Sequence, residues 1–217
     1  MLRSVSAVPA ADPSNEPDGG RTYAGRTPDE RRAERRTRLV DAGLQVFGTT
    51  RWDEAGIALL CATARVATRS FYEEFDSREA LLLEVATGIV LEGAERLLAA
   101  LVAAPATLED KVRAGLSAYL MFLTEDPRRA RVAYGAVPAA GGLLTDRHRA
   151  SAGFAELIAG QAAELGVAPR AVGNPLLALA LTGAAGELLG YWAATTPPPE
   201  IEPILEELVA LFVAALS

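Results

Sequence analysis

The chain has 217 residues, of which 50% are apolar, so it is long enough to bury a substantial core and is not globally disordered. Its net charge of −7 excludes a uniformly basic chain, and its single histidine and single cysteine leave little material for a metal centre or a catalytic triad. We therefore expect no enzyme activity, no catalytic residue, no metal and no cofactor. Cys61 lies in an apolar run and is predicted to be a buried structural thiol.

Residues 1–26 are predicted to form a disordered tail, because they are rich in Pro, Gly, Ser and Asp and show no periodicity. They contain no apolar segment of the length found in secretory signals, so we expect a cytoplasmic protein. Ordered structure should begin at Thr27-Pro28-Asp29-Glu30, where Thr27 and Glu30 are spaced as a capping box. A helix from 28 to about 49 follows, with an apolar stripe of Leu39, Ala42, Gly43, Val46 and Phe47.

The stretch from Trp52 to Phe75 has the pattern of a helix, a tight turn and a second helix. We expect helices at about 54–64 and from 67 or 68 onward, joined by a turn at Arg65-Val66. Phe71 and Phe75 are four residues apart and should anchor the second helix to the core. The outward-facing side chains would then be Thr68, Arg69, Ser70 and Tyr72. In a helix-turn-helix the second helix enters the DNA major groove, so residues 27–75 are predicted to form a DNA-binding domain.

Charge is distributed unevenly along the chain. Residues 26–72 contain nine arginines and six acids, whereas residues 73–217 contain ten basic residues and nineteen acids. A basic N-terminal segment followed by an acidic remainder is typical of a DNA-binding protein, although solvated helices can show the same asymmetry. The arginines at 31, 32, 35 and 36 likewise suit either phosphate contacts or a solvated helix face.

Helices are also predicted for the remaining residues 76–217. Their expected ranges are about 77–104, 107–125, 127–137, 143–165, 175–194 and 200–216, and most are bounded by capping residues, proline or glycine. No stretch of useful length alternates with a period of two. The sequence therefore indicates an all-α fold of about nine helices.

The segment 175–194 is nearly all apolar and is long enough to cross a membrane. However, Glu187 lies near its middle, it is rich in small residues, and no basic flank orients it. We interpret it as a helix buried in a bundle or dimer interface and expect no membrane contact.

Residues 38–83 resemble the DNA-binding segment of the tetracycline-repressor (TetR) family of transcriptional regulators. The matching positions are Phe47, the group Phe71, Tyr72 and Phe75, and the run Ser77-Arg78-Glu79-Ala80-Leu81. The resemblance implies that Thr68, Arg69 and Ser70 face the bases and that Tyr72 and Arg78 contact phosphates. Arg78 stands where the family usually has lysine.

Four positions depart from the family pattern. Arg51 and Arg65 replace glycines, and Ala55 and Ala67 replace the usual Ser/Thr helix caps. A non-glycine residue with positive φ costs about 1–2 kcal/mol, and a lost cap costs about 1 kcal/mol. Asp53 and Thr68 are candidate substitute caps. Either tertiary packing supports the motif or DNA binding is weakened.

The resemblance also implies that residues 76–217 bind a small-molecule effector and form a homodimer through about 175–194 and 200–216. The last helix carries an apolar stripe of Ile204, Leu205, Leu208, Leu211, Phe212 and Ala215, although an internal core helix would carry one too. Candidate effector contacts are aromatic or polar residues in apolar helices: Tyr119, Phe122, Tyr134, His148, Phe154, Glu187 and Trp192. Each of these also suits an ordinary core or surface position. The aliphatic body favours an apolar effector.

We therefore expect a homodimeric DNA-binding regulator, a repressor, that binds a pseudo-palindromic DNA operator and is released by the effector. One alternative is a dimeric helical ligand-binding protein whose DNA binding is weakened or lost. Another is an all-α enzyme or ligand carrier, for which the sequence offers no nucleophile, metal cluster or acid pair. Salt-dependent binding to duplex DNA distinguishes the regulator from both alternatives.

Overall fold

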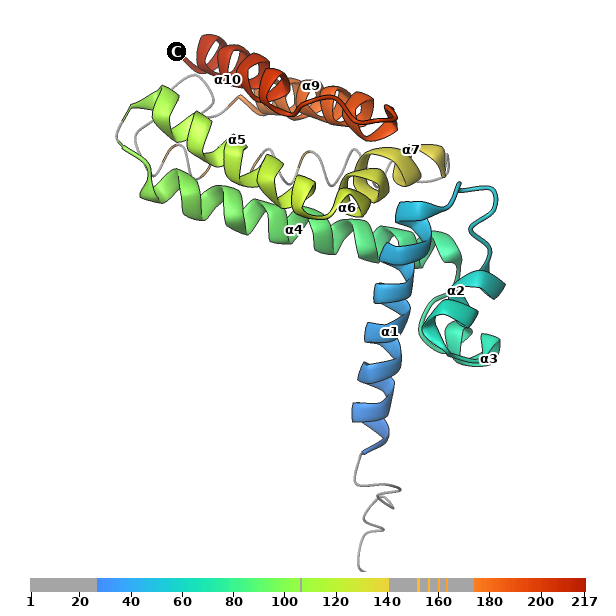
Figure 1. Cartoon of the computed structure of the whole chain (residues 1–217). Helices are drawn as coiled ribbons and strands as arrows, with labels where there is room; N and C mark the ends of the chain where they lie inside the picture. Colours follow the sequence, from blue (N-terminus) through green and yellow to red (C-terminus); the bar gives the residue numbers. More distant parts are fainter. Residues whose placement is uncertain are drawn as a thin grey trace, which may run out of the picture.

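A computed structural model of the chain describes residues 27–105, 107–140, 152, 156, 160, 163 and 174–217. All regular structure in these residues is helical, which confirms the all-α class. The predicted tail lies outside the described residues, and of the predicted helix at 143–165 only four positions are described, all helical. Helix α1 (Pro28–Thr49) projects from a body built on two long helices, α4 and α5, while α2 and α3 lie beside α1 (Figure 1).

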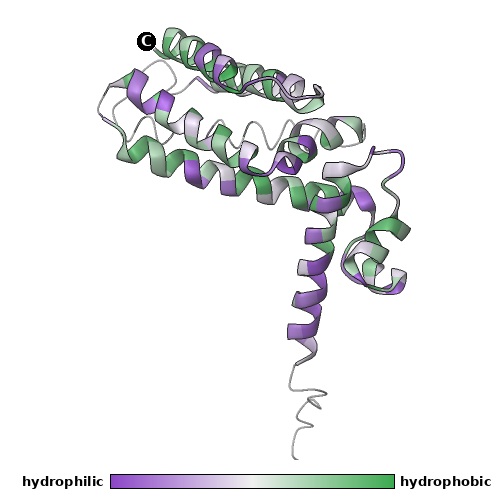
Figure 2. Cartoon of the chain, viewed as in Figure 1, coloured by the Kyte–Doolittle hydropathy of each residue, from purple (hydrophilic) through white to green (hydrophobic). Residues whose placement is uncertain are grey.

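We call α1–α3 the head and the rest the body. Helix α1 begins as the sequence predicts, because Thr27 accepts a hydrogen bond from the Glu30 amide and the Glu30 carboxylate accepts one from the Thr27 amide. All five residues of its predicted apolar stripe are buried. Figure 2 shows that the hydrophilic part of α1 is its N-terminal half, which extends away from the body.

Helix α2 (Ile57–Ala64) begins three residues later than predicted. Residues 52–54 form a turn instead, and Gly56 is the N-cap. Asp53 does not cap this helix, because its carboxylate bonds the guanidinium of Arg51. Helix α3 (Thr68–Tyr72) follows, and neither α2 nor α3 has a side-chain cap at its N-terminus. The stability of this motif must therefore come from packing.

The body is built on α4 (Arg78–Ala103) and α5 (Leu108–Glu125), which pack against each other. Both N-termini are capped as expected, by Ser77 and Thr107. Gly93 permits the close approach of these helices, because a Cβ atom there would lie 2.4 Å from the Tyr119 ring. The chain's only lysine, Lys111, is buried, and its ammonium donates to the carbonyls of Leu101 and Ala104 at the end of α4.

The segment predicted as one short helix at 127–137 contains a π-turn. It consists of α6 (Pro127–Arg131), the π-helix η1 (Val132–Ala136) and α7 (Val137–Ala139). Asp126 caps its start by accepting from the Arg128 amide. α6 and η1 together contact α1, α4, α5 and α9, so this segment joins the head to the body.

Helices α9 (Pro175–Ala194) and α10 (Glu202–Leu216) cover the other side of the body (Figure 1). Three residues of the predicted α10 stripe, Ile204, Leu205 and Leu208, are buried, and α10 packs on α5, so much of this stripe serves the internal core. Leu211 is exposed. Helix α9 is long and apolar enough to span a membrane, and 22% of its apolar window is buried within the chain.

Candidate nucleic-acid interface

Helix α3 presents polar side chains to solvent from a buried aromatic base. Phe71 is fully buried and Phe75 nearly so, with their ring centroids 6.0 Å apart. Thr68, Arg69 and Tyr72 are exposed, whereas Ser70 is half-buried. The Arg69 side chain is 92% exposed and lies 3.5 Å from Glu73, an ion pair that solvent screens strongly. The Tyr72 ring packs edge-on against Phe71, which fixes its direction.

The turn between α2 and α3 has the left-handed conformation that the family's glycine would favour. Arg65 has φ 55° and ψ 47° and is the one non-glycine residue with positive φ among the described residues. Its amide donates to the Ala62 carbonyl, and the Val66 amide donates to the Cys61 carbonyl. These two bonds form a Schellman motif, which retains the turn without glycine.

The end of α3 is held against α1 by a buried carboxylate that the sequence did not reveal. Two adjacent acids, Glu73 and Glu74, are typical of a solvated helix surface, but the Glu74 side chain is only 1% exposed. Its oxygens accept from Arg32 at 3.2 Å and Arg35 at 3.3 Å, and its carbonyl accepts from Arg36. These three arginines therefore have a structural role in positioning α3. Burying a carboxylate requires such compensation.

Arg78 also has a structural role in the head. Its guanidinium lies 4.0 Å from the centroid of the Trp52 ring, and its Nη1 donates to the carbonyls of Trp52 and Ala55. Its Nε donates to Glu79. Arg78 thus ties the start of α4 to the α1–α2 turn, and Nη2 is left for a contact outside the chain.

The head contacts the body where the end of α1 packs against α6. A Cβ atom on Gly48 would lie 2.5 Å from the Arg128 Cβ, so glycine is required for this approach. The Arg128 guanidinium donates to the Gln45 side chain at 2.9 Å and pairs with Asp126. The hydrogen bond from Arg128 to Gln45 and the close backbone approach couple the orientation of α1 to that of α6.

Two of the predicted effector residues meet inside the body. The hydroxyls of Tyr119 in α5 and Tyr134 in η1 are 2.7 Å apart. Burial raises the pKa of Tyr119 above its usual value and raises that of Tyr134 well above it, so both phenols are neutral at physiological pH. Gly186 and Gly190 of α9 lie against Tyr134. This pair links α5 to η1 and also lies against α4 and α9, so it is a polar group at a point where four elements of the body meet.

The other predicted effector residues are not gathered at that pair. Phe122 is fully buried, and the guanidiniums of Arg96 and Arg129 lie within 4.6 Å of its ring centroid. Trp192 is buried and donates to the Pro199 carbonyl. Glu187 is exposed, so of the two positions that the sequence allowed, core or surface, it occupies a surface position. His148 and Phe154 lie outside the described residues.

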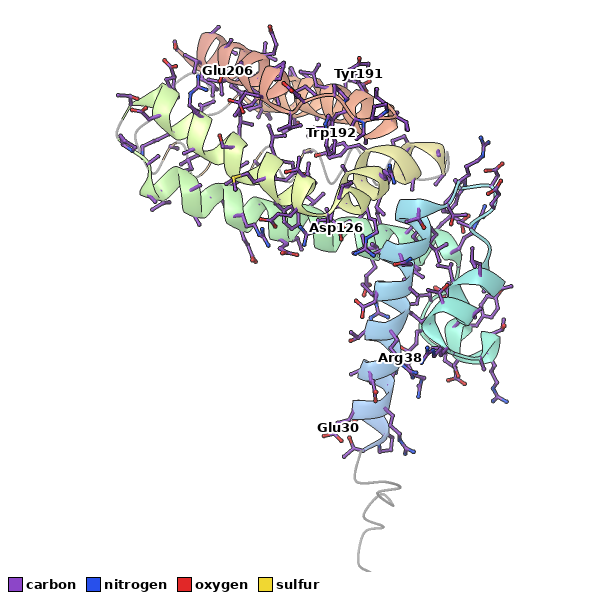
Figure 3. The ribbon with its side chains drawn as sticks, viewed as in Figure 1. Glu30, Arg38, Asp126, Tyr191, Trp192 and Glu206 are labelled. Atoms are coloured by element: carbon purple, nitrogen blue, oxygen red, sulfur yellow. The ribbon has the colours of Figure 1, made fainter. Side chains whose placement is uncertain are left out.

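One face of α9 is mostly apolar and is exposed in the single chain. Its exposed residues include Leu176, Leu179, Gly183 and Tyr191, with Leu176 76% and Tyr191 63% exposed, and the carboxylate of Glu187 lies on the same face. Figure 3 shows Trp192 directed into the body and Tyr191 directed away from it. The sequence predicted a helix buried on most sides, and within one chain this burial is not achieved.

No group of three or more His, Cys, Asp or Glu side chains suited to a metal occurs in the part of the chain that the structure describes.

Comparison with known proteins identifies the family of the DNA-binding segment. Residues 39–85 match the model of the bacterial regulatory proteins of the tetR family, and this range contains α2, α3 and the turn between them. The matched range includes every position predicted to contact DNA. A search of curated proteins found no significant match.

Solved structures share the fold across most of the chain. The fatty acid degradation regulator FadR from Bacillus halodurans is 15% identical, with a TM-score of 0.68 over 82% of this chain and 94% of that one. The TetR family repressor AlkX from Dietzia sp. strain DQ12-45-1b, implicated in biodegradation of n-alkanes, is 16% identical, with a TM-score of 0.59 over 83% and 94%. A tetR-family regulator from Streptomyces coelicolor is 19% identical, with a TM-score of 0.63 over 84% and 80%.

Proposed function

We propose that this protein is a homodimeric repressor of the TetR family that binds a pseudo-palindromic operator through α3 and is released by a small apolar effector. The observation that carries the proposal is the outward projection of Thr68, Arg69 and Tyr72 from a helix whose other side is fixed by Phe71 and Phe75. Residues 27–75 would form the DNA-binding domain and residues 76–217 the effector-binding and dimerisation domain.

The contacts to DNA follow from the chemistry of the exposed side chains. Arg69, at the start of α3, is suited to donate two hydrogen bonds to guanine O6 and N7 in the major groove. Thr68 and Ser70 are short enough to contact neighbouring base edges, and Tyr72 would bind a phosphate. Arg78 would add a phosphate contact only through Nη2, because Nη1 and Nε are bonded within the chain.

Dimerisation would cover the exposed face of α9. Leu176, Leu179 and Tyr191 form an apolar surface with Gly183 between them, where a Cβ atom would meet no heavy atom of the chain within 4 Å. A two-fold partner presenting the same face would bury it and bring α10 into a four-helix arrangement. Two α3 helices about 34–36 Å apart would then enter successive major grooves.

The effector would bind in the body and act through the segment α6–η1–α7. Tyr134 in η1 is hydrogen-bonded to Tyr119, while α6, directly before it in the chain, contacts α1 at Gly48 and Gln45. A ligand that displaces Tyr134 would therefore also move α6, and with it the contact between α6 and α1. The FadR and AlkX structures, described as a fatty acid degradation regulator and as implicated in n-alkane biodegradation, support an apolar effector. The effector can shift the equilibrium between the DNA-binding and the released conformations only by as much as its affinities for these two conformations differ.

The test is a gel shift with the DNA that flanks the protein's own gene, over a range of salt concentrations. Wild-type protein should bind with a steep salt dependence. The double variant Arg69→Ala, Tyr72→Ala should bind at least about 100-fold more weakly, while the body variant Arg113→Ala on α5 should match the wild type. Undiminished binding by the double variant would refute the assignment of α3. Absence of any salt-dependent duplex binding, with ligand binding retained, would favour the alternative of a ligand-binding dimer.

A further inference from the structure

A cleft of about 660 Å³ separates the head from the body. One wall is formed by the end of α1 and the turn that follows it, from Phe47 to Asp53. The other wall consists of Arg131, Gly135, Ala136, Ala139, Ala193, Ala194 and Thr196, which belong to α6, η1, α7 and the end of α9. The volume lies in the range of about 300–1,000 Å³ typical of small-molecule sites.

Each wall of the cleft contributes one guanidinium group. Arg51 comes from the head and Arg131 from the body. Arg131 is exposed and has no ion pair within the described residues, whereas Arg128 and Arg129 of the same helix pair with Asp126 and Glu125. Arg51 uses Nε and Nη2 to bond Asp53, so its Nη1 remains for another acceptor.

Asp53 is the one carboxylate among the lining residues that the structure describes. The hydrogen bond from Arg51 lowers the pKa of Asp53, so it is ionised at neutral pH. Two guanidiniums and one carboxylate leave the cleft with a single positive charge. A singly charged anion matches this balance, whereas a polyphosphate would leave uncompensated negative charge.

The remaining lining is suited to an apolar group. Phe47 and Trp52 have ring centroids 5.8 Å apart on the head side, and four alanines and a glycine face them from the body. The hydroxyls of Thr50 and Thr196 have no hydrogen-bond partner within the described residues. Neither Tyr119 nor Tyr134 lines the cleft, so it is separate from the proposed effector site.

We propose that this cleft binds a small organic monoanion, a carboxylate with an aromatic or short aliphatic group, held by Arg131 and Arg51 together. The apolar group packs against Trp52 and the alanines of the body. Because the ligand is held by both walls, it fixes the head relative to the body and changes operator affinity without entering the body core. If the proposed function holds, operator affinity would then respond to two ligands, one bound in the body and one bound in this cleft.

Binding is tested on the full chain without DNA, by isothermal titration with benzoate and phenylacetate as probes. Their uncharged amides, benzamide and phenylacetamide, serve as matched ligands. We expect saturable binding of a carboxylate and at least about tenfold weaker binding of its amide, because a charge-assisted hydrogen bond is lost. Arg131→Gln should weaken carboxylate binding by a similar factor, while Arg38→Gln, an exposed arginine on α1, should not.

Trp52 provides a second readout. The chain has two tryptophans, so in a Trp192→Phe background Trp52 is the only one, and its fluorescence should change on titration with the carboxylate. Equal binding of carboxylate and amide, or undiminished binding to the Arg131 variant, would overturn the proposal. Operator affinity measured with and without the carboxylate then tests the coupling. If the carboxylate binds but leaves operator affinity unchanged, the coupling is disproved and the binding site stands. If the protein fails to bind the operator even without carboxylate, the result contradicts the proposed function and not the binding site.

Discussion

The head and helix α9 use their apolar residues in opposite ways. In the head, Leu39, Leu60 and Phe71 have no exposed surface, and the exposed side chains of α3 are mainly polar. In α9, Leu176 and Tyr191 are largely exposed, although nearly the whole helix is apolar. The head therefore buries its apolar core within one chain, whereas α9 leaves apolar side chains exposed. This difference is consistent with the proposed functions, since a helix that reads DNA must be held rigidly and a dimer interface must be exposed in the single chain.

The largest expected effect is loss of the head core. Phe71→Ala removes a fully buried aromatic ring and should destabilise the protein by about 3–5 kcal/mol. Its neighbour Tyr72 is 56% exposed, so Tyr72→Ala should change stability by no more than about 0.5 kcal/mol. Denaturant unfolding followed by tryptophan fluorescence measures both. Equal effects would mean that α3 is not anchored as described.

The next effect concerns the uncovered face of α9. Gly183→Leu should weaken self-association by about 30-fold, or about 2 kcal/mol, because the new side chain separates two closely packed helices. Gly88→Leu on α4 is the matched control, since a Cβ atom at either glycine meets nothing within 4 Å in the single chain. Sedimentation equilibrium gives the association constants. A Gly183 variant that dimerises as well as the control would place the interface elsewhere.

A smaller effect is expected within the body, where the buried ammonium group of Lys111 bonds the last carbonyls of α4. Lys111→Met removes the donor that bonds the carbonyls of Leu101 and Ala104 and should cost about 1–2 kcal/mol. For a chain of this size that lowers the Tm by roughly 2–4 °C per kcal/mol, which calorimetry can measure. Lys111→Arg retains a donor and should restore part of the loss. A Met variant as stable as the wild type would show that the carbonyls find other partners.

The smallest change is a gain in stability in the head. Arg65→Gly relieves a left-handed conformation that costs a non-glycine residue about 1 kcal/mol, so the variant should unfold at a slightly higher temperature. Operator affinity in the gel shift should stay unchanged unless the Arg65 side chain contacts DNA. A lower unfolding temperature would indicate that the Arg65 side chain stabilises the head by more than the strain costs.

Local signals in the sequence predicted most helix boundaries. The caps Thr27, Ser77, Thr107, Asp126 and Asn174 all accept backbone hydrogen bonds where the helices begin. Where such a signal was absent the prediction was less accurate, as at α2, whose start was placed three residues early. The π-turn in η1 also escaped prediction, because its extra residue leaves the apolar pattern intact.

The sequence alone determined the all-α class and the burial of Phe71 and Phe75, because two apolar residues four positions apart lie on the same face of a helix. Only the tertiary structure showed that Glu74 is buried between arginines of α1, that Arg78 holds Trp52, and that a cleft with two guanidiniums lies beneath the head. Contacts of this kind join residues some 26 to 42 positions apart. No local pattern encodes them, since they depend on how whole helices are oriented against one another.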